Sequence, residues 1–600
     1  MPHVITQSCC GDGSCVYSCP VNCIHPSPDE PGFASAEMLY IDPAACVDCG
    51  ACVSACPVGA IRHQSRLTPA ELPFIAVNAD YYPSRPTGAK VPPTSKLAPV
   101  LPAPRLRGRG LTVAIVGSGP AGMYAADELL TQAGVRVNVF EKLPTPYGLV
   151  RSGVAPDHQS TKGITALFDR ISAAHGFTYF LNTEVGKHIS HAELLARHHA
   201  VLYAVGAPGD RRLEVDGMGR PGTASATELV AWVNGHPHFA TRTFDLSHHR
   251  AVVIGNGNVA LDVARILTAG PESLSATDIS DAALQVLRRS SLREVVVAAR
   301  RDPAGSAFTL PELIGLVTTA DVVLDAADHA LVRRDLGSER DPATRAKLEI
   351  LAGLPDAAAA VSRPRIRLAY RLTPSRVTGR DRAEGVQFVR TGSTDIVTLA
   401  AGLVLTSIGY RGAPVAGLPF DEAAAVVPNR AGRVTDPATG RPVRGAYVAG
   451  WIKRGPTGFI GTNKSCALET VATLADDFNA GLLGEPDVRP SALRRLVRSR
   501  HPDVVDADGW RAIDAAETAL GSAAGRPRVK FTAVPDMLEV VAASGRQRRF
   551  PLPSRRKKAR KADDGGGFAS ARGEGTRGQG RWEISSQPGT DSGARGGGPT

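Results

Sequence analysis

A glycine-rich turn that follows an apolar strand is the feature that most constrains this chain. Residues 111–116 are apolar and largely β-branched, and they lead into Gly117-Ser-Gly-Pro-Ala-Gly122. The G-x-G-x-x-G pattern predicts a strand that enters a helix, whose positive N-terminus faces a dinucleotide pyrophosphate. About twenty residues later a second apolar strand ends at Glu141, where a carboxylate can accept hydrogen bonds from a ribose. We therefore expect dinucleotide binding here rather than a purely structural turn, with Gly117, Gly119 and Gly122 in the cradle.

A second fingerprint of the same kind lies at residues 251–267. An apolar strand leads into Gly255-Asn-Gly257-Asn-Val-Ala260 and then into an apolar helix. The next strand ends at Arg300-Arg301 instead of an acid. Guanidinium groups bind phosphate through paired, charge-assisted hydrogen bonds, so the pair predicts a 2′-phosphate and hence NADP. The alternative is a solvated arginine pair on a loop.

Cysteine usage and hydropathy indicate the compartment. Nine of the ten cysteines precede residue 57, whereas a secreted disulfide protein spreads its cysteines through the domains that they cross-link. The sequence has no apolar run long enough for a membrane span and no signal-like N-terminus. We expect a cytoplasmic protein that does not enter the membrane.

The cysteine spacing predicts iron–sulfur clusters. Cys46-x-x-Cys49-x-x-Cys52-x-x-x-Cys56-Pro has the bacterial pattern in which the fourth cysteine binds the neighbouring cluster. The first group follows the same template except that Asp12 stands where the second cysteine would be. Zinc ribbons need two C-x-x-C pairs, which this pattern does not provide. We predict a [4Fe–4S] cluster on Cys19, Cys46, Cys49 and Cys52, and a [4Fe–4S] or [3Fe–4S] cluster on Cys9, Cys15 and Cys56, with Asp12 or nothing as fourth ligand; Cys10, Cys23 and Cys466 are not expected to be ligands.

Six hundred residues are too many for one hydrophobic core. The basic run at 546–561 carries nine positive residues, so the net charge of +11 says little about the folded domains. The composition of residues 546–600 favours a disordered tail over a nucleic-acid-binding arm. We predict a ferredoxin domain at 1–62, a proline-rich linker at 63–108, a discontinuous FAD domain at 109–207 and 400–531, an inserted NADP domain at 208–399, and a disordered basic and glycine-rich tail at 546–600.

The two fingerprints predict two different nucleotides. NADPH delivers a hydride, whereas iron–sulfur clusters accept one electron at a time, so a carrier of both kinds of chemistry is needed. Flavin is such a carrier. We therefore assign FAD to the turn at residues 117–122, whose following strand ends at Glu141. We assign NADP to the turn at residues 255–260, whose following strand ends at Arg300-Arg301.

Five motifs carry a resemblance to a known family: GSGPAG, PTPYGLVRSGVAPDH, GNGNVALDVARIL, ARRDP and GWIKRGPTGFIGTNK. Residues 109–531 resemble the adrenodoxin reductase-like ferredoxin–NADP⁺ reductases. With the N-terminal ferredoxin segment included, roughly nine-tenths of the chain resembles the mycobacterial fused ferredoxin/ferredoxin–NADP⁺ reductases. The resemblance implies an α/β fold with two Rossmann-like domains of the three-layer ββα type, the NADP domain being inserted in the FAD domain. A small α+β bacterial two-cluster ferredoxin domain would precede them.

The resemblance also implies site residues. His158 matches a family histidine that lies near the isoalloxazine and is associated with catalysis. Some relatives carry an acid one helical turn after Glu312, where this chain has Gly315, so a two-residue proton relay is not assured. The implied FAD contacts are Ala121, Glu141, Leu149, Val185, Trp451, Gly458, Phe459 and Ile460, and the implied NADP contacts are Arg211, Asn256, Gly257, Asn258, Val259, Arg300, Arg301, Glu312 and Gly458.

We thus expect a monomeric NADPH:ferredoxin oxidoreductase, in which hydride passes from NADPH to FAD and single electrons pass to the clusters or to an external ferredoxin. An electron-input module of a larger synthase or reductase is an alternative. A redox-sensing nucleic-acid-binding protein is another, although it leaves both nucleotide sites unexplained. Disulfide reductase activity is not expected, because residues 57–600 contain only Cys466.

Overall fold

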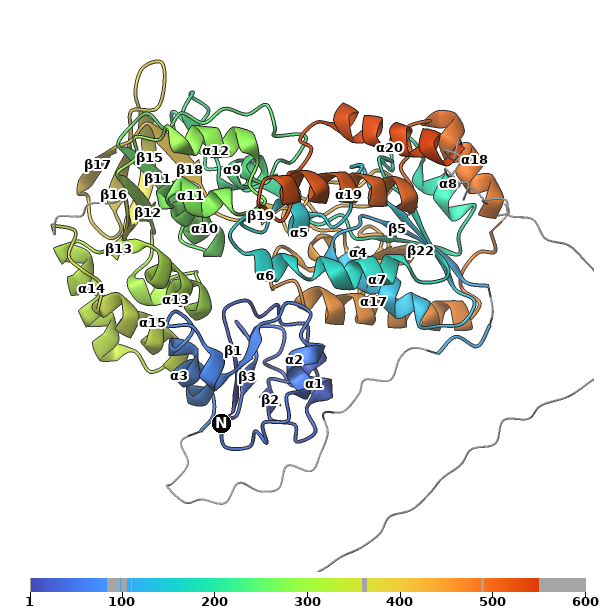
Figure 1. The fold of residues 1–600 in the computed structure, drawn as a ribbon, viewed down its shortest axis with the longest axis horizontal. Helices are drawn as coiled ribbons and strands as arrows, with labels where there is room; N and C mark the ends of the chain where they lie inside the picture. Colours follow the sequence, from blue (N-terminus) through green and yellow to red (C-terminus); the bar gives the residue numbers. More distant parts are fainter. Residues whose placement is uncertain are drawn as a thin grey trace, which may run out of the picture. The chain divides into compact units, whose positions relative to one another are not determined.

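The computed structural model describes residues 2–83, 98, 105–108, 110–358, 364–486 and 490–549, and these belong to one compact unit (Figure 1). None of the described helices is both long and apolar enough to cross a membrane. Most of the predicted tail, from residue 550 onward, lies outside the described residues, whereas 546–549 continue a helix.

The N-terminal domain is built from two short antiparallel pairs. Strand β1 pairs with β4, and β2 pairs with β3. A cysteine-bearing helix precedes each Cys-Pro motif, and both helices start at a left-handed glycine, Gly13 or Gly50. The elements are β1 His3–Ile5, α1 Ser14–Ser18, β2 Ile24–His25, β3 Tyr40–Ile41, α2 Ala51–Ala55, β4 Ile61–His63, the 3-10 helix Gln64–Arg66 and α3 Pro73–Asp80.

This domain extends beyond the predicted boundary at residue 62. Helix α3 lies in the segment that its prolines predicted to be linker, yet Phe74 is buried in the domain core. The buried amide of Asn78 bonds to the backbone of Ile5 and Ile41, and the hydroxyl of Tyr82 donates to the carbonyl of Tyr40. Proline at the first turn of a helix costs nothing, because its N–H would be unpaired there anyway. The prolines before residue 83 therefore do not mark a linker, contrary to the prediction, but lie in part of the folded domain.

The FAD domain contains a seven-stranded sheet in the order β20-β21-β22-β8-β5-β6-β7. Val113 and Ile115 pack on one face with α4, α7 and α17, while Ala114 and Val116 pack on the other. Its strands are β5 Thr112–Val116, β6 Arg136–Phe140, β7 Phe177–Phe180, β8 Ala200–Tyr203, β20 Asn429–Arg430, β21 Arg433–Thr435 and β22 Pro442–Val448. Its helices are α4 Pro120–Leu130, α5 Leu149–Ser152, α6 Gln159–Lys162, α7 Thr165–Ser172, α8 His191–Leu195, α16 Trp451–Arg454, α17 Thr462–Asn479, α18 Pro490–Arg500, α19 Ala507–Ala523 and α20 Val534–Arg549.

The NADP domain has helices on one face of its parallel sheet and a three-stranded antiparallel sheet on the other, which is the predicted ββα layering. Its strands are β10 Thr223–Ser225, β11 Arg250–Ile254, β12 Glu294–Ala298, β13 Asp321–Val323, β14 Arg365–Ala369, β15 Leu372–Thr378, β16 Gly385–Arg390, β17 Ile396–Ala400 and β18 Leu403–Thr406. Its helices are α9 Ala226–Val233, α10 Asn258–Thr268, α11 Pro271–Ser275, α12 Asp281–Arg288, the 3-10 helix Pro303–Gly305, α13 Leu310–Thr319, α14 Ala326–Ser338 and α15 Pro342–Ala352.

The two chain crossings between the nucleotide domains lie side by side. Strand β9 (Gly209–Asp210) pairs antiparallel with β19 (Tyr410–Arg411). Strand β18 belongs to the NADP-domain sheet, where it pairs with β10 and β11. The predicted end of the NADP domain at 399 is therefore several residues too early, because an apolar strand does not reveal which sheet it joins.

A buried ion network joins the FAD domain, the NADP domain and the C-terminal segment. The carboxylate of Asp278 accepts from the ammonium groups of Lys162 and Lys530, at 2.7 Å each, and all three side chains are almost fully buried. Both lysines also bond to the amide oxygen of Asn234. The network therefore holds three separate chain segments together at one point.

Replacing Asp278 with asparagine should destabilise the fold by about 3 kcal/mol, because two buried ammonium groups would lose their counter-charge. The expected observation is a lower thermal unfolding midpoint. Asp281→Asn is the matched control. The Asp281 carboxylate is exposed, so its ion pair with Arg526 contributes little to the free energy of unfolding. Equal midpoints for the two variants would contradict a structural role for the network.

Candidate functional site

The first dinucleotide turn has no room for side chains at two of its glycines. A Cβ on Gly117, where φ is +102°, would lie 2.4 Å from the carbonyl oxygen of Ala204. A Cβ on Gly122 would lie 2.0 Å from the carbonyl oxygen of Gly117. No atom lies within 4 Å of a Cβ built on Gly119, so the open side of the turn is there. This is the bare backbone cradle that a pyrophosphate needs at the N-terminus of α4.

Glu141 at the end of β6 folds back onto the same turn. Its carboxylate accepts from the backbone N–H of Ser118 at 3.1 Å, from the hydroxyl of Ser118 at 2.9 Å and from the N–H of Leu143 at 3.2 Å. Glu141 therefore holds the turn in shape, from the position after β6 that is predicted to face a ribose.

The other predicted FAD contacts come from separate segments. A Cβ on Gly450 would lie 2.6 Å from the Cβ of Ala121, so the start of α16 abuts the first turn. The Trp451 ring packs 5.0 Å from Tyr410, and its indole N–H donates to Thr457 at 3.1 Å. Leu149 is 41% exposed at the start of α5, and Val185 is half-buried. Gly458, with φ +80°, Phe459 and Ile460 form the turn before α17.

The second dinucleotide turn repeats the first in the NADP domain. A Cβ on Gly255 would lie 2.1 Å from the carbonyl oxygen of Ser407. Asn258 bonds through its side chain to Thr309, which joins the turn to the start of α13. The amide nitrogen of Asn256 is buried and has no partner among the described residues. A buried donor without an acceptor is costly, so this turn fits a nucleotide that supplies one.

The three arginines predicted to bind NADP are exposed. Arg300 and Arg301 follow β12, and within the described ranges neither side chain has an ion-pair partner. The neighbouring acid, Asp302, pairs instead with Arg334 at 2.9 Å. Arg211 lies near the start of the NADP domain, where its backbone N–H donates to the carbonyl of Gly409 at 2.9 Å. The pair at the end of β12 is therefore available to a 2′-phosphate.

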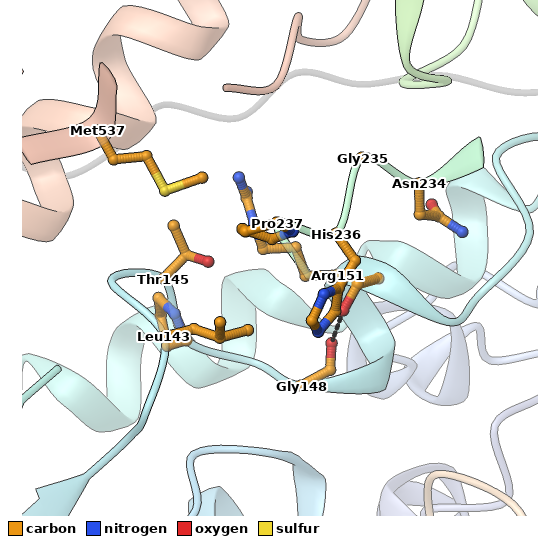
Figure 2. Close-up of a pocket in the computed structure, with 11 residues that line it drawn as sticks. Leu143, Thr145, Gly148, Arg151, Asn234, Gly235, His236, Pro237 and Met537 are labelled. Atoms are coloured by element: carbon orange, nitrogen blue, oxygen red, sulfur yellow. Dashed lines mark hydrogen bonds between the residues drawn. The ribbon is translucent and has the colours of Figure 1, made fainter. Parts of the chain in front are cut away.

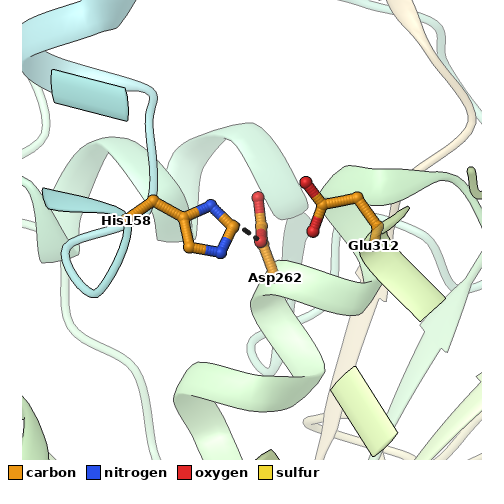
Figure 3. Close-up of side chains that lie close together, drawn as sticks. All are labelled: His158, Asp262 and Glu312. Atoms are coloured by element: carbon orange, nitrogen blue, oxygen red, sulfur yellow. Dashed lines mark ion pairs between the residues drawn. The ribbon is translucent and has the colours of Figure 1, made fainter. Parts of the chain in front are cut away.

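His158 lies in a network of charged side chains between the two nucleotide domains. Figure 3 shows His158, Asp262 and Glu312 turned toward one another, and one ligand atom from each lies within 4.8 Å of the others. The His158 Nδ1 is 3.9 Å from Asp262, and its Nε2 accepts from the Arg265 guanidinium at 2.9 Å. Arg265 also binds Asp157 at 2.6 Å and Asp262 at 2.7 Å.

This network can hold a proton. Burial, and then the charge of Asp262, raise the pKa of Glu312. Although burial alone would raise the pKa of Asp157, the hydrogen bond from Arg265 lowers it. Asp262 and Arg265 were not among the residues predicted for the site. Their position on the helix after the second turn was the available signal, because Asn258 and Asp262 lie one helical turn apart on the same face.

Three predicted cluster ligands lie close together, with Cys15 buried and Cys9 and Cys56 partly buried. The negative charges of Cys9 and Cys56 raise the pKa of Cys15, and the charge of Cys56 raises the pKa of Cys9. Burial raises the pKa of all three thiols, that of Cys9 to about 11, and the negative charge of Asp12 adds to this. Such thiols stay protonated unless positive charge is present, which cluster iron would provide. The group therefore fits an iron–sulfur cluster.

The side chain of Asp12, the fourth residue predicted there, is already engaged. It accepts from the N–H of Ser14 at 3.3 Å and from the hydroxyl of Ser14, and it lies 3.8 Å from the ammonium of Lys464. Asp12 thus holds the loop at the start of α1.

The other four predicted ligands line one surface cavity, together with Cys23, His3 and several apolar residues. Cys23 was not expected at a cluster, yet its sulfur lies 3.4 Å from that of Cys19. Its hydrogen bonds lower the pKa of Cys19 to about 6 and that of Cys46 to about 5. Cys49 is exposed and Val47 is 58% exposed at the rim. The cavity fits a cluster close to the surface.

A separate surface cavity lies beside the loop that follows Glu141 (Figure 2). Leu143, Arg151, His236 and Met537 line it, and Ser152 donates to the carbonyl of Gly148 at its edge. None of the predicted site residues borders this cavity.

Comparisons with known proteins agree with this geometry. A model of the 4Fe-4S binding domain matches residues 39–62, and a model of the pyridine nucleotide-disulphide oxidoreductase family matches residues 111–302. A probable ferredoxin/ferredoxin–NADP reductase of Mycobacterium leprae is 67% identical over 546 residues, which cover 91% of this chain and 98% of that protein. The chain belongs to the ferredoxin/ferredoxin–NADP reductase family.

The corresponding protein of Mycobacterium tuberculosis strain H37Rv is also 67% identical, over 91% of this chain and 96% of that protein. The solved structure of Mycobacterium tuberculosis FprA in complex with NADPH is 39% identical, with a TM-score of 0.67; it covers 72% of this chain and all of FprA. These matches confirm the predicted α/β fold with an N-terminal ferredoxin domain, and the prediction of an oxidoreductase.

Proposed function

We propose that this ferredoxin–NADP⁺ reductase carries its own first electron acceptor, in the form of two iron–sulfur clusters in residues 2–82. It takes a hydride from NADPH and delivers single electrons, finally to an external ferredoxin or another one-electron acceptor. A bound FAD supplies the conversion between hydride and one-electron chemistry. The fit of both glycine turns and both cysteine groups, within one compact unit, supports this proposal.

Each set of residues has a distinct task. Arg300 and Arg301 bind the 2′-phosphate of NADPH, and Glu141 holds the first turn and bonds to the flavin nucleotide's ribose. The carboxylate of Asp262 lies 3.9 Å from the Nδ1 of His158, so a proton can pass between them without any acid at position 315, while Arg265 holds the ring at its Nε2. Asp262 therefore takes the place of the second relay residue that Gly315 does not supply.

One contact carries the proposal of an internal acceptor. The carbonyl oxygen of Cys10 accepts from the N–H of Gly461 at 2.7 Å, and a Cβ on Gly461 would lie 2.1 Å from the Gly11 backbone. The loop that holds Cys9 therefore packs directly on the turn that precedes α17, which the family pattern assigns to FAD. Cys9, Cys10 and Cys56 pack with the FAD-domain core. A cluster held at the three-cysteine site would thus receive electrons first, and one held at the four-cysteine site, with its exposed Cys49, would pass them on.

The cluster types follow from the ligands. The four-cysteine cavity holds [4Fe–4S]. The three-cysteine site holds [3Fe–4S], because the carboxylate of Asp12 is committed to Ser14 and Lys464. The gathering of the cysteines at the two predicted cluster sites supports a cytoplasmic location. We also propose that the protein is a monomer, which size-exclusion chromatography can test.

An anaerobic NADPH titration of the full-length holoprotein tests the proposal. Absorbance should show bleaching of the flavin, and EPR should show one [3Fe–4S] and one [4Fe–4S] signal that respond to NADPH. Flavin bleaching with clusters that never respond would contradict the internal acceptor. No bleaching at all would contradict the reductase function.

A further inference from the structure

The ferredoxin domain contacts the NADP domain at the helix that carries Glu312. The side-chain amide of Gln7 donates to one carboxylate oxygen of Glu312 at 3.1 Å. Leu310 and Ile314 of α13 are buried in the apolar core of the ferredoxin domain. The carboxylate of Glu37 accepts from the N–H of Leu310 at 2.7 Å. The first turn of α13 is therefore held by a domain that begins about three hundred residues earlier in the chain.

Gly315 explains how the contact can form. A Cβ at this position would lie 2.2 Å from the amide nitrogen of Gln7 and 2.4 Å from its oxygen. Any other residue at 315 would push the amide of Gln7 away from Glu312. The glycine on α13 and the glutamine of the ferredoxin domain therefore fit each other.

We propose that Gln7 is a positioning residue of the NADP site, which acts through Glu312. The amide holds one oxygen of a carboxylate that is turned toward His158 and Asp262 (Figure 3). The ferredoxin domain thereby completes the nicotinamide side of the reductase, in addition to accepting electrons. This inference rests on the proposed function in one respect, the assignment of Glu312 to the NADP site.

Two variants remove the contact from opposite sides. Gln7→Ala deletes the donor, and Gly315→Ala displaces it without any change in the ferredoxin domain. Each should weaken NADP⁺ binding about tenfold, the value of one hydrogen bond to a charged group. Binding is measured on the full-length holoprotein by the perturbation of the flavin absorbance, and EPR checks that both clusters remain. The double variant should bind as weakly as either single variant, because both remove the same contact.

Lys347→Met is the matched control. Lys347 contacts Glu37 across the same interface, at 3.3 Å, but it does not touch Glu312. NADP⁺ affinity should be unchanged in this variant. Wild-type affinity in Gln7→Ala, or an equal loss in Lys347→Met, would overturn the proposal, since the contact would then be irrelevant or serve only to attach the domain. Absence of NADP⁺ binding by the wild-type protein would instead overturn the proposed function.

Discussion

Replacing Arg300 and Arg301 together with alanine should reduce the preference for NADPH over NADH by about 100- to 1,000-fold. Each guanidinium provides charge-assisted hydrogen bonds to the 2′-phosphate, and a hydrogen bond to a charged group contributes about 1.5–3 kcal/mol. Both side chains are exposed, and the adjacent acid is committed to Arg334, so no ion pair has to be broken before they bind phosphate. The measurement is kcat/KM for flavin reduction with each nucleotide.

The rate with NADH should hardly change, because that nucleotide has no 2′-phosphate. Arg333→Ala is a suitable control, since Arg333 is an exposed arginine on α14 of the same domain. If the double variant retained a strong preference for NADPH, the phosphate site would have to be elsewhere, and Arg211 would be the first residue to test.

Replacing Cys56 with serine should remove the cluster at the three-cysteine site and isolate the flavin from the four-cysteine site. Removing a residue that only hydrogen-bonds to a metal ligand already lowers metal affinity by about 10- to 100-fold. Removing a ligand itself should therefore lower it by more than about 100-fold. NADPH should still bleach the flavin at the wild-type rate. Reduction of the remaining cluster should become very slow, because electron transfer rates fall steeply with distance.

Freeze-quench EPR follows each cluster after mixing with NADPH. Cys10→Ser is the matched control, because Cys10 is a buried thiol next to a predicted ligand in the same loop, but is not itself predicted to bind iron. Normal reduction of the four-cysteine cluster in Cys56→Ser would contradict the proposed order of the two sites. Loss of the first cluster in Cys10→Ser would show that the ligand assignment is wrong.

The nucleotide turns were predictable because their signals are local. Gly117, Gly122 and Gly255 are needed where backbone passes close to backbone, and each lies next to the strand that defines its turn. The cysteine spacing is likewise local, since short loops determine which thiols can meet. The end of the ferredoxin domain was not predictable in this way, because helix α3 is recognisable only from the buried contacts of Phe74 and Asn78 with strands far from it in sequence.

The sequence by itself determined the family, the two nucleotide turns, the arginine pair after β12 and the two groups of cysteines. Only the tertiary structure showed that Asp262 and Arg265 surround His158, and that Gln7 reaches Glu312 over Gly315. The physical reason is chain separation: these contacts join side chains whose neighbours in sequence do not indicate them. They form only when three domains pack together, and packing depends on surfaces that no single motif encodes.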